Sequence, residues 1–378
     1  MIGDLARRER FYQLQTGIVT DRVTGYRGAP AGSAGRRVTD LYGMREGTGE
    51  MKILVTGGAG YIGSHVVRQL SEAGHGVVVY DNLSTGFADA LLHGETLVTG
   101  DLADTERLGE VIREYGCRTV IHFAAAIVAP ESVVNPLKFY SNNTRNTFNL
   151  LRACVSCGVE RFIFSSTAAV YGMPPGGTCT ETTPTVPINP YGTSKLMSEW
   201  MLRDVAQAHP LHYVALRYFN AAGADPLARI GQRTPEATHL IKVCCQAALG
   251  LRERVTIYGT DYPTPDGTGI RDYIHVEDLA SAHLAALRHL EKGGESVVLN
   301  VGTGRGASVR EVIEVAHRES GVPFAVAEGE RRPGDPAMLV AEAARIRSVL
   351  GWQPVRSDLT SIVADAWRWE QELAHRGR

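Results

Sequence analysis

Apolar runs and amphipathic stretches alternate along the chain from Lys52 onward. Short apolar runs rich in β-branched residues predict strands, at 52–56, 77–80, 96–99, 119–123 and 161–165. Amphipathic stretches predict helices between them, at 64–73, 105–115 and 137–157. Strands that are apolar throughout and alternate with helices are typical of a parallel sheet covered on both faces. The pattern therefore predicts an α/β fold with a doubly wound, Rossmann-type parallel sheet.

The alternation weakens after a predicted helix at 191–208 and a strand at 212–219. Loops rich in proline, glycine and charge interrupt the later elements, at 225–235, 260–269 and 328–336. We expect residues 51–220 to form the Rossmann domain, which includes the helix predicted at 191–208. Residues 221–378 are expected to form mainly a smaller α+β lobe at the carboxyl edge of the sheet, with a segment at about 270–310 returning to the Rossmann domain.

Residues 1–50 differ in composition from the rest of the chain. They carry scattered arginines with many glycines and serines, and they show no sustained apolar period. They also lack the apolar core of a secretory signal. We interpret this segment as a disordered leader or as a non-native start upstream of Met51.

Composition argues against several classes of function. The formal net charge is −2 over 378 residues, which does not indicate a nucleic-acid or membrane surface. No apolar run is long enough to span a bilayer. The six cysteines and twelve histidines show no metal-ligand spacing, so we expect no metal site, and the sparse cysteines suit a reducing cytoplasm.

A glycine-rich turn joins the first predicted strand to the first predicted helix. Its glycines are Gly57, Gly60 and Gly63, a spacing that permits a tight turn, close approach of a pyrophosphate and close helix–strand packing. The helix that follows directs free N–H groups and a partial positive charge at such an anion. The turn between strand and helix therefore predicts a dinucleotide site.

Two acidic residues at the ends of later strands indicate which dinucleotide binds. Asp81 ends the second strand, where a carboxylate accepts hydrogen bonds from a ribose diol and repels a 2′-phosphate. Asp101 ends the third strand, where it is placed to accept a hydrogen bond from the adenine amino group. We therefore predict NAD, in preference to NADP, as the cofactor.

Candidate catalytic residues lie at the end of the fifth strand and the start of the next helix. Tyr191 and Lys195 are four residues apart and share one helical face, and Thr167 follows the strand. A phenol with a pKa of about 10 is a poor base at neutral pH, but a neighbouring ammonium and a positive nicotinamide favour the phenolate. Tyr191 is then suited to take a proton from a hydroxyl whose carbon loses a hydride.

Longer motifs extend this pattern over nearly all of residues 51–378. They are VTGGAGYIGSH at 55–65, FIFSSTAAVYG at 162–172, PYGTSK at 190–195, GTDYPTPDGTGIRDYIH at 259–275 and RRPGD at 331–335. In these motifs the chain resembles the extended short-chain dehydrogenase/reductase superfamily. Within it, the chain is most similar to the UDP-glucose 4-epimerase family, including the members that serve bacterial exopolysaccharide synthesis.

The resemblance implies roles for individual residues. Catalysis is assigned to Thr167, Tyr191 and Lys195. Together with the glycine turn, it implies NAD contacts for Gly57, Gly60, Tyr61, Ile62, Gly63, Asp81, Asn82, Asp101, Leu102, Phe123, Ala124, Asn143, Ser165, Tyr191, Lys195 and Tyr218. Nucleotide-sugar contacts are implied for Thr167, Asn220, Leu240, Tyr258, Arg271, Arg332 and Asp335. The two arginines of this set are suited to hold a diphosphate through paired donors.

Two positions depart from the pattern of the family. Ile127 stands where some of these epimerases place a lysine against the cofactor. Met338 is assigned to a position near the hexose that is tyrosine in some relatives and smaller in others. Whether N-acetylated sugars are accepted is therefore left open at this stage.

The resemblance implies reversible epimerisation of UDP-glucose and UDP-galactose at C4, through a transient 4-keto sugar and bound NADH. It also implies a homodimer that packs through helices near 140–157 and 191–207. Alternatives are a 4-epimerase of N-acetylated or uronic UDP-sugars, and a UDP-glucuronate decarboxylase. A nucleotide-sugar dehydratase is disfavoured, because Ala168 and Ala169 stand where those enzymes place an Asp-Glu pair.

An NAD-sensing protein without catalysis is a further alternative on the same fold. Such a protein needs the glycine turn but not Thr167, Tyr191 and Lys195, all of which are present. The complete catalytic set therefore favours an enzyme.

Overall fold

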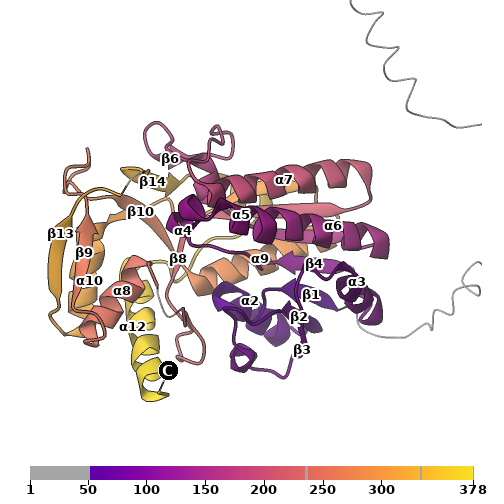
Figure 1. The fold of residues 1–378 in the computed structure, drawn as a ribbon, viewed down its shortest axis with the longest axis horizontal. Helices are drawn as coiled ribbons and strands as arrows, with labels where there is room; N and C mark the ends of the chain where they lie inside the picture. Colours follow the sequence, from indigo (N-terminus) through magenta and orange to yellow (C-terminus); the bar gives the residue numbers. More distant parts are fainter. Residues whose placement is uncertain (1–51, 235–236, 333, 378) are drawn as a thin grey trace, which may run out of the picture. The chain divides into compact units, whose positions relative to one another are not determined.

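A parallel sheet of seven strands forms the larger part of the fold (Figure 1). The computed structural model describes residues 52–234, 237–332 and 334–377, so the expected leader at 1–50 lies outside the described residues. The strand order is β3-β2-β1-β4-β5-β7-β11, and every neighbouring pair is parallel. The strands are β1 (Ile53–Thr56), β2 (Val77–Asp81), β3 (Thr96–Thr99), β4 (Thr119–His122), β5 (Arg161–Thr167), β7 (His212–Tyr218) and β11 (Val297–Val301).

Helices cover both faces of this sheet. One face packs against α2 (Tyr61–Glu72), α9 (Val276–Glu291) and α11 (Ala344–Leu350), and the other packs against α3 (Thr105–Glu114), α6 (Asn146–Cys157) and α7 (Pro190–Ala208). Side chains alternate between the faces along each strand, so Leu54 and Val55 are both fully buried but belong to different apolar clusters. The doubly wound α/β prediction is confirmed.

The helix expected at 137–157 is divided. The structure has α4 (Ala129–Val134), α5 (Pro136–Phe139), a π-helical turn η3 (Tyr140–Arg145) and then α6. Pro136 has no N–H and starts α5, with the Asn135 side chain accepting from Lys138 N at 3.4 Å. A wider π turn is frequent beside functional sites, and this one places Asn143 in the interior.

A smaller lobe is built largely from the later part of the chain. Its helices and strands are β6 (Thr178–Cys179), β8 (Asn220–Ala222), α8 (Leu240–Ala248), β9 (Arg254–Tyr258), β10 (Ile270–His275), β12 (Gly306–Ser308), α10 (Val309–Ser320), β13 (Ala325–Gly329), β14 (Met338–Ala341) and α12 (Leu359–His375). Ile241, Ile257, Val312 and Ile362 form part of its apolar cluster. Two short 3-10 helices, η2 (Ala88–Ala90) and η4 (Ala168–Tyr171), follow β2 and β5. The chain returns to the large sheet at α9 and β11 before re-entering the lobe at β12.

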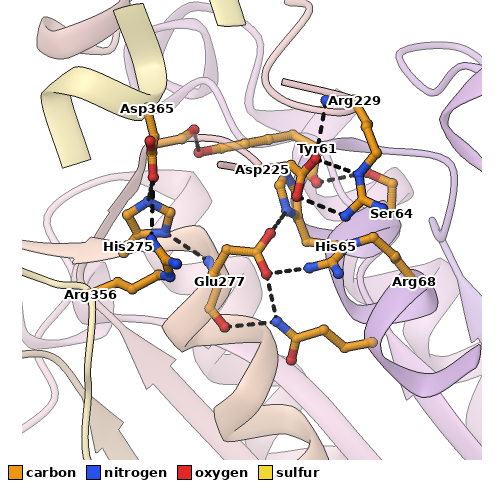
Figure 2. Close-up of polar contacts among 12 residues, drawn as sticks. Tyr61, Ser64, His65, Arg68, Asp225, Arg229, His275, Glu277, Arg356 and Asp365 are labelled. Carbon is orange, nitrogen blue, oxygen red and sulfur yellow. Dashed lines mark hydrogen bonds and ion pairs between the residues drawn. The ribbon is translucent and has the colours of Figure 1, made fainter. Parts of the chain in front are cut away.

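A buried polar network fixes α9 against α2 (Figure 2). Glu277 accepts from His65 Nδ1 at 2.6 Å and from Gln69 Nε2 at 2.8 Å, and it forms an ion pair with Arg68. Burial lowers the pKa of His65, so this imidazole donates as a neutral group and the counter-charge is Arg68. Burial alone would raise the pKa of Glu277, but His65, Arg68 and Gln69 together lower it to about 2.

We predict that Glu277→Gln destabilises the protein by about 3 kcal/mol at neutral pH, because Arg68 loses its buried partner. A carboxyl with a folded pKa of about 2 and an ordinary pKa of 4.5 stabilises the fold above pH 4.5. Its contribution declines as the pH falls from 4.5 toward 2, and the variant should lack this component of the pH dependence. Urea unfolding at pH 7 and pH 4 measures both effects.

The exposed ion pair Arg310–Glu328 supplies the matched control, and Glu328→Gln should change the free energy of unfolding by less than about 1 kcal/mol. Equal losses in the two variants would contradict the role assigned to Glu277.

Candidate active site

Close backbone contacts shape the glycine turn between β1 and α2. Gly57 has a φ of +73°, and a Cβ there would lie 2.5 Å from Ala124 N. A Cβ on Gly63 would lie 2.2 Å from the carbonyl oxygen of Gly57. The first turn of α2 has no acidic residue and no side chain capping its N–H groups. Its amides are therefore available to an anion, as a dinucleotide pyrophosphate requires.

A cleft opens beside this turn at the carboxyl ends of β1, β2, β3 and β4. Predicted cofactor residues that line it are Gly57, Gly60, Tyr61, Ile62, Gly63, Asp81, Asn82, Asp101, Leu102, Phe123, Ala124 and Tyr218. Further lining residues that the sequence analysis missed are Tyr80, Ser84, Thr85, Gly100, Ala125, Asn142 and Asn146. Ile127 also lines the cleft and is 60% exposed, and no lysine or arginine is among the lining residues described.

Asp81 connects the wall of the cleft to the glycine turn. One carboxylate oxygen accepts from Ala59 N at 3.0 Å and the other accepts from Leu83 N at 2.9 Å. Asn82 donates to Asp101 at 2.8 Å, so the two predicted acidic positions belong to one polar rim. Carboxylates along a rim without a cationic side chain match a ribose diol better than a ribose phosphate. The residues present therefore fit NAD.

Two predicted cofactor residues lie behind the lining. Asn143 is buried, and its side chain bonds to Ala126 N at 2.8 Å, Ala126 O at 3.0 Å and Ser194 Oγ at 3.0 Å. Ser165 bonds through its hydroxyl to Tyr218. Both side chains hold the wall in place, while Asn142 and Asn146 line the cleft itself. The π turn at Tyr140–Arg145 turns Asn143 inward while Asn142 and Asn146 line the cleft, and residue spacing alone does not show this arrangement.

Lys195 is buried behind the catalytic strand. Its Nζ donates to the carbonyl of Ser165 at 2.9 Å and lies 5.1 Å from the centre of the Phe164 ring. Burial lowers the pKa of Lys195 to about 7, and the charge of Glu199 opposes that shift. The lysine therefore gains or loses its charge near neutral pH, and β5 and α7 are linked through it.

Tyr191 follows Pro190 at the first turn of α7, where Asn189 caps the helix by accepting from Gly192 N at 2.9 Å. Burial raises the pKa of Tyr191, and the neighbouring Thr167 hydroxyl offsets part of that rise. The structure thus brings together Thr167, Tyr191 and Lys195 from β5 and α7, as their positions in the sequence predict. A half-buried phenol with a neighbouring hydroxyl and a lysine one turn away is arranged for proton transfer.

Predicted substrate residues form two pairs in the smaller lobe. Arg271 lies 3.5 Å from the carboxylate of Asp335. The guanidinium of Arg332 stacks on the ring of Tyr258, with Cζ 3.9 Å from the ring centre. Asp335 N also donates to Arg332 O at 3.2 Å, so the two pairs are adjacent. The guanidinium groups of these two pairs are suited to bind a diphosphate through charge-assisted hydrogen bonds.

Asn220 and Leu240 lie on other elements of the lobe. Asn220 begins β8 and is in register with Tyr273 of β10, two residues after Arg271. Leu240 begins α8 and packs against the lobe's apolar cluster. Among the described residues, no side-chain hydrogen bond joins Asn220 to Arg271 or Arg332.

Met338 and Leu339 point to opposite sides of β14. Met338 lines a hollow with Gly177 and Tyr262. Leu339 packs with Ala168, which directly follows Thr167 in the chain. Strand alternation therefore makes Leu339, and not Met338 as expected from the sequence, the β14 side chain on the catalytic side.

A known family shares the arrangement described above, in which a glycine turn follows β1, an acidic residue ends β2, and Tyr191 and Lys195 lie on α7. The NAD dependent epimerase/dehydratase family matches residues 53–302. This chain belongs to that family. The resemblance found in the sequence is confirmed, and the chain is an enzyme of this family with NAD as its cofactor.

Several proteins similar to this chain are named as UDP-sugar 4-epimerases. The UDP-glucose 4-epimerase of Azospirillum brasilense is 56% identical over 85% of this chain and 92% of its own length. The crystal structure of UDP-glucose 4-epimerase from Brucella ovis in complex with NAD has a TM-score of 0.82 and 46% identity, over 84% of this chain and 98% of that one. The UDP-Glc/GlcNAc 4-epimerase from Campylobacter jejuni has a TM-score of 0.76 and 49% identity, over 85% and 99%.

Metal clusters and membrane spans are not found among the residues that the structure describes. Within the part of the chain that the structure describes, no three His, Cys, Asp or Glu side chains gather as metal ligands. Among the same residues, no helix has the length and apolarity needed to cross a bilayer.

We predict that Asp81→Ser lowers the affinity for NAD by about tenfold to 100-fold, since a charge-assisted hydrogen bond to the ribose is lost. Removing the carboxylate also removes repulsion of a 2′-phosphate, so the affinity for NADP should rise while the affinity for NAD falls. The ratio of the two affinities should therefore fall by a larger factor than the NAD affinity does. Titration of the cofactor-free protein with each dinucleotide measures the ratio. An unchanged ratio would show that Asp81 does not select the cofactor.

Proposed function

We propose that this enzyme interconverts UDP-glucose and UDP-galactose at C4 through a transient 4-keto sugar. The observation that carries the proposal is the set of buried Thr167 and Lys195 with the half-buried Tyr191, beside a cleft that fits NAD. The names of the similar proteins from Azospirillum brasilense and Brucella ovis support the same substrate. NAD held by the residues that line the cleft would supply the hydride acceptor and donor for oxidation and reduction at C4 of the sugar.

The residues of this chain supply the proton chemistry. Tyr191 takes the proton of the C4 hydroxyl, and the Thr167 hydroxyl positions the same oxygen. Burial opposes ionisation of both Tyr191 and Lys195, so the phenolate needs a positive charge in addition to the lysine. The oxidised nicotinamide carries such a charge, which links proton removal to the oxidised state of the cofactor.

The nucleotide part of the substrate is assigned to the smaller lobe. Arg271 and Arg332 hold the diphosphate, with Tyr258, Asp335, Asn220 and Leu240 around it. Firm binding of the diphosphate leaves the hexose free to turn between two faces, as epimerisation requires. We accordingly divide the chain into an NAD-binding domain at 51–220 and a substrate lobe at 221–378, with about 270–310 returning to the former.

The second candidate substrate is an N-acetylated UDP-hexose. It is favoured by the similarity to the UDP-Glc/GlcNAc 4-epimerase of Campylobacter jejuni and by the aliphatic Leu339 on the catalytic side of β14. The same assay with UDP-GlcNAc decides between a strict and a broad hexose preference.

We predict that the full chain, incubated with UDP-galactose and no added NAD, forms UDP-glucose up to a fixed equilibrium ratio without net NADH. Tyr191→Phe should lower the turnover number by about 10²-fold to 10⁴-fold, because it removes the proton acceptor and keeps the ring. Product analysis by anion-exchange chromatography measures both. A variant with unimpaired turnover would refute the role of Tyr191, and absence of product even with NAD supplied would refute the hexose assignment.

We further propose a homodimer in the cytoplasm. Helices α4, α5, α6 and α7 lie side by side (Figure 1). They carry large exposed apolar side chains, at Val133, Val134, Leu137, Phe148 and Trp200. Several exposed apolar side chains on neighbouring helices are typical of an interface between subunits.

Phe148→Glu combined with Trp200→Glu should convert the dimer to monomers, because two charges cannot be buried unpaired at the interface. Light scattering measures the mass, and Val355→Glu, at an exposed apolar position on another part of the surface, is the control. A wild-type monomer, or a double variant that stays dimeric, would contradict the interface.

A further inference from the structure

A hairpin at 223–233 stands between the smaller lobe and the cofactor side of the sheet. An antiparallel bridge between Ala224 and Gly231 closes it. Asp225 is buried and accepts from the guanidinium of Arg229 at 2.7 and 3.0 Å (Figure 2). These bonds within the hairpin give it a defined conformation.

Helix α12 holds the hairpin from the side of the smaller lobe. Trp369 Nε1 donates to Gln232 O at 3.0 Å, and Arg368 donates to Pro226 O at 2.8 Å. A Cβ on Gly231 would lie 2.6 Å from the Trp369 ring, so the hairpin backbone packs directly on the indole. The hairpin is therefore a firm part of the smaller lobe.

On its other side the hairpin contacts residues of the cofactor cleft. Tyr61, the first residue of α2, donates its hydroxyl to Gly223 O at 2.7 Å. Arg233 donates to Asp89 at 2.6 Å, and its guanidinium stacks on Phe87 with Cζ 3.8 Å from the ring centre. Arg233 thus joins two segments that are 144 residues apart in the sequence.

Phe87 and Asp89 belong to the loop that forms one wall of the cleft. Ser84 and Thr85 line the cleft just before them. Phe87 N donates to Ala59 O at 2.9 Å, which attaches the loop to the glycine turn. The guanidinium of Arg233 therefore packs against the 84–89 loop, next to the part of the cleft where we predict the pyrophosphate and ribose of NAD.

We propose that Arg233 is a positioning residue that holds the 84–89 loop over the bound cofactor and slows the release of NAD. The ion pair alone is weak, because the Asp89 side chain is 66% exposed. We expect the stack on the half-buried Phe87 ring to contribute more than the ion pair to holding the loop. This stack needs the planar guanidinium of Arg233. The proposal depends on NAD as the cofactor and not on which UDP-sugar is the substrate.

The test measures release of the cofactor itself. Full-length protein is loaded with radiolabelled NAD and diluted into excess unlabelled NAD, and retained label is followed with time. Arg233→Ala should release NAD about tenfold faster, the effect of losing a partly desolvated stack together with an ion pair. The change should fall on release and on NAD affinity, with a much smaller effect on turnover at saturating NAD.

Further variants distinguish an effect of Arg233 on cofactor release from a general effect on the stability of the fold. Arg233→Lys keeps the charge but not the plane, so its release rate should lie between those of Arg233→Ala and the wild type. Phe87→Leu should speed release, and adding Arg233→Ala to it should have less effect than Arg233→Ala alone. Arg310→Ala, which removes an exposed ion pair on another part of the surface, should leave release unchanged.

The proposal is overturned if Arg233→Ala releases NAD at the wild-type rate, or if Arg310→Ala speeds release equally. It is also overturned if the wild type retains no label. A different result would count only against the proposed substrate. In that case the protein would not act on UDP-galactose, but replacing Arg233 would still speed the release of NAD. Should Arg233→Ala fold poorly, Asp89→Asn at the exposed partner tests the same contact and should speed release about twofold.

Discussion

The contact between the glycine turn and the end of β4 sets the geometry of the whole cofactor side. Gly57 lies so close to Ala124 that no side chain fits between them, and Gly63 is equally close to Gly57. These contacts bring the start of α2 to the carboxyl edge of the sheet with its amides uncovered. Every other part of the cleft is placed relative to this point, including Asp81, whose carboxylate accepts from the backbone of the turn.

A second constraint is the buried charge of Lys195. In the interior an ammonium needs a partner, and the carbonyl of Ser165 provides it. The bond fixes α7 on β5, so Tyr191 is held near Thr167 instead of elsewhere on the helix. Proton chemistry and sheet packing thus depend on the same hydrogen bond, because a shift of α7 along β5 would expose or isolate the lysine.

Local periodicity made the sheet, its two helical layers and the Tyr191–Lys195 helix predictable. Strand alternation and residue spacing act over a few residues, which is the range that a sequence shows directly. The inward position of Asn143 depends on a π turn that residue spacing does not show, and the placing of Met338 and Leu339 depends on the register of β14 with its partner β10. The lining residues Ser84 and Thr85 lacked a sequence signal, since only the fold of their loop brings them to the cleft.

Contacts between the two lobes depend on pairs that lie far apart in the chain, and no spacing rule identifies them. Arg233 with Asp89 and Tyr61 with Gly223 each join segments more than 140 residues apart. Both connect residues around the glycine turn or α2 to the hairpin of the smaller lobe. A substrate held by Arg271 and Arg332 must meet a cofactor held at α2, so the two lobes need a fixed separation. Rigid polar contacts between the lobes supply that separation, whereas apolar packing alone would tolerate sliding.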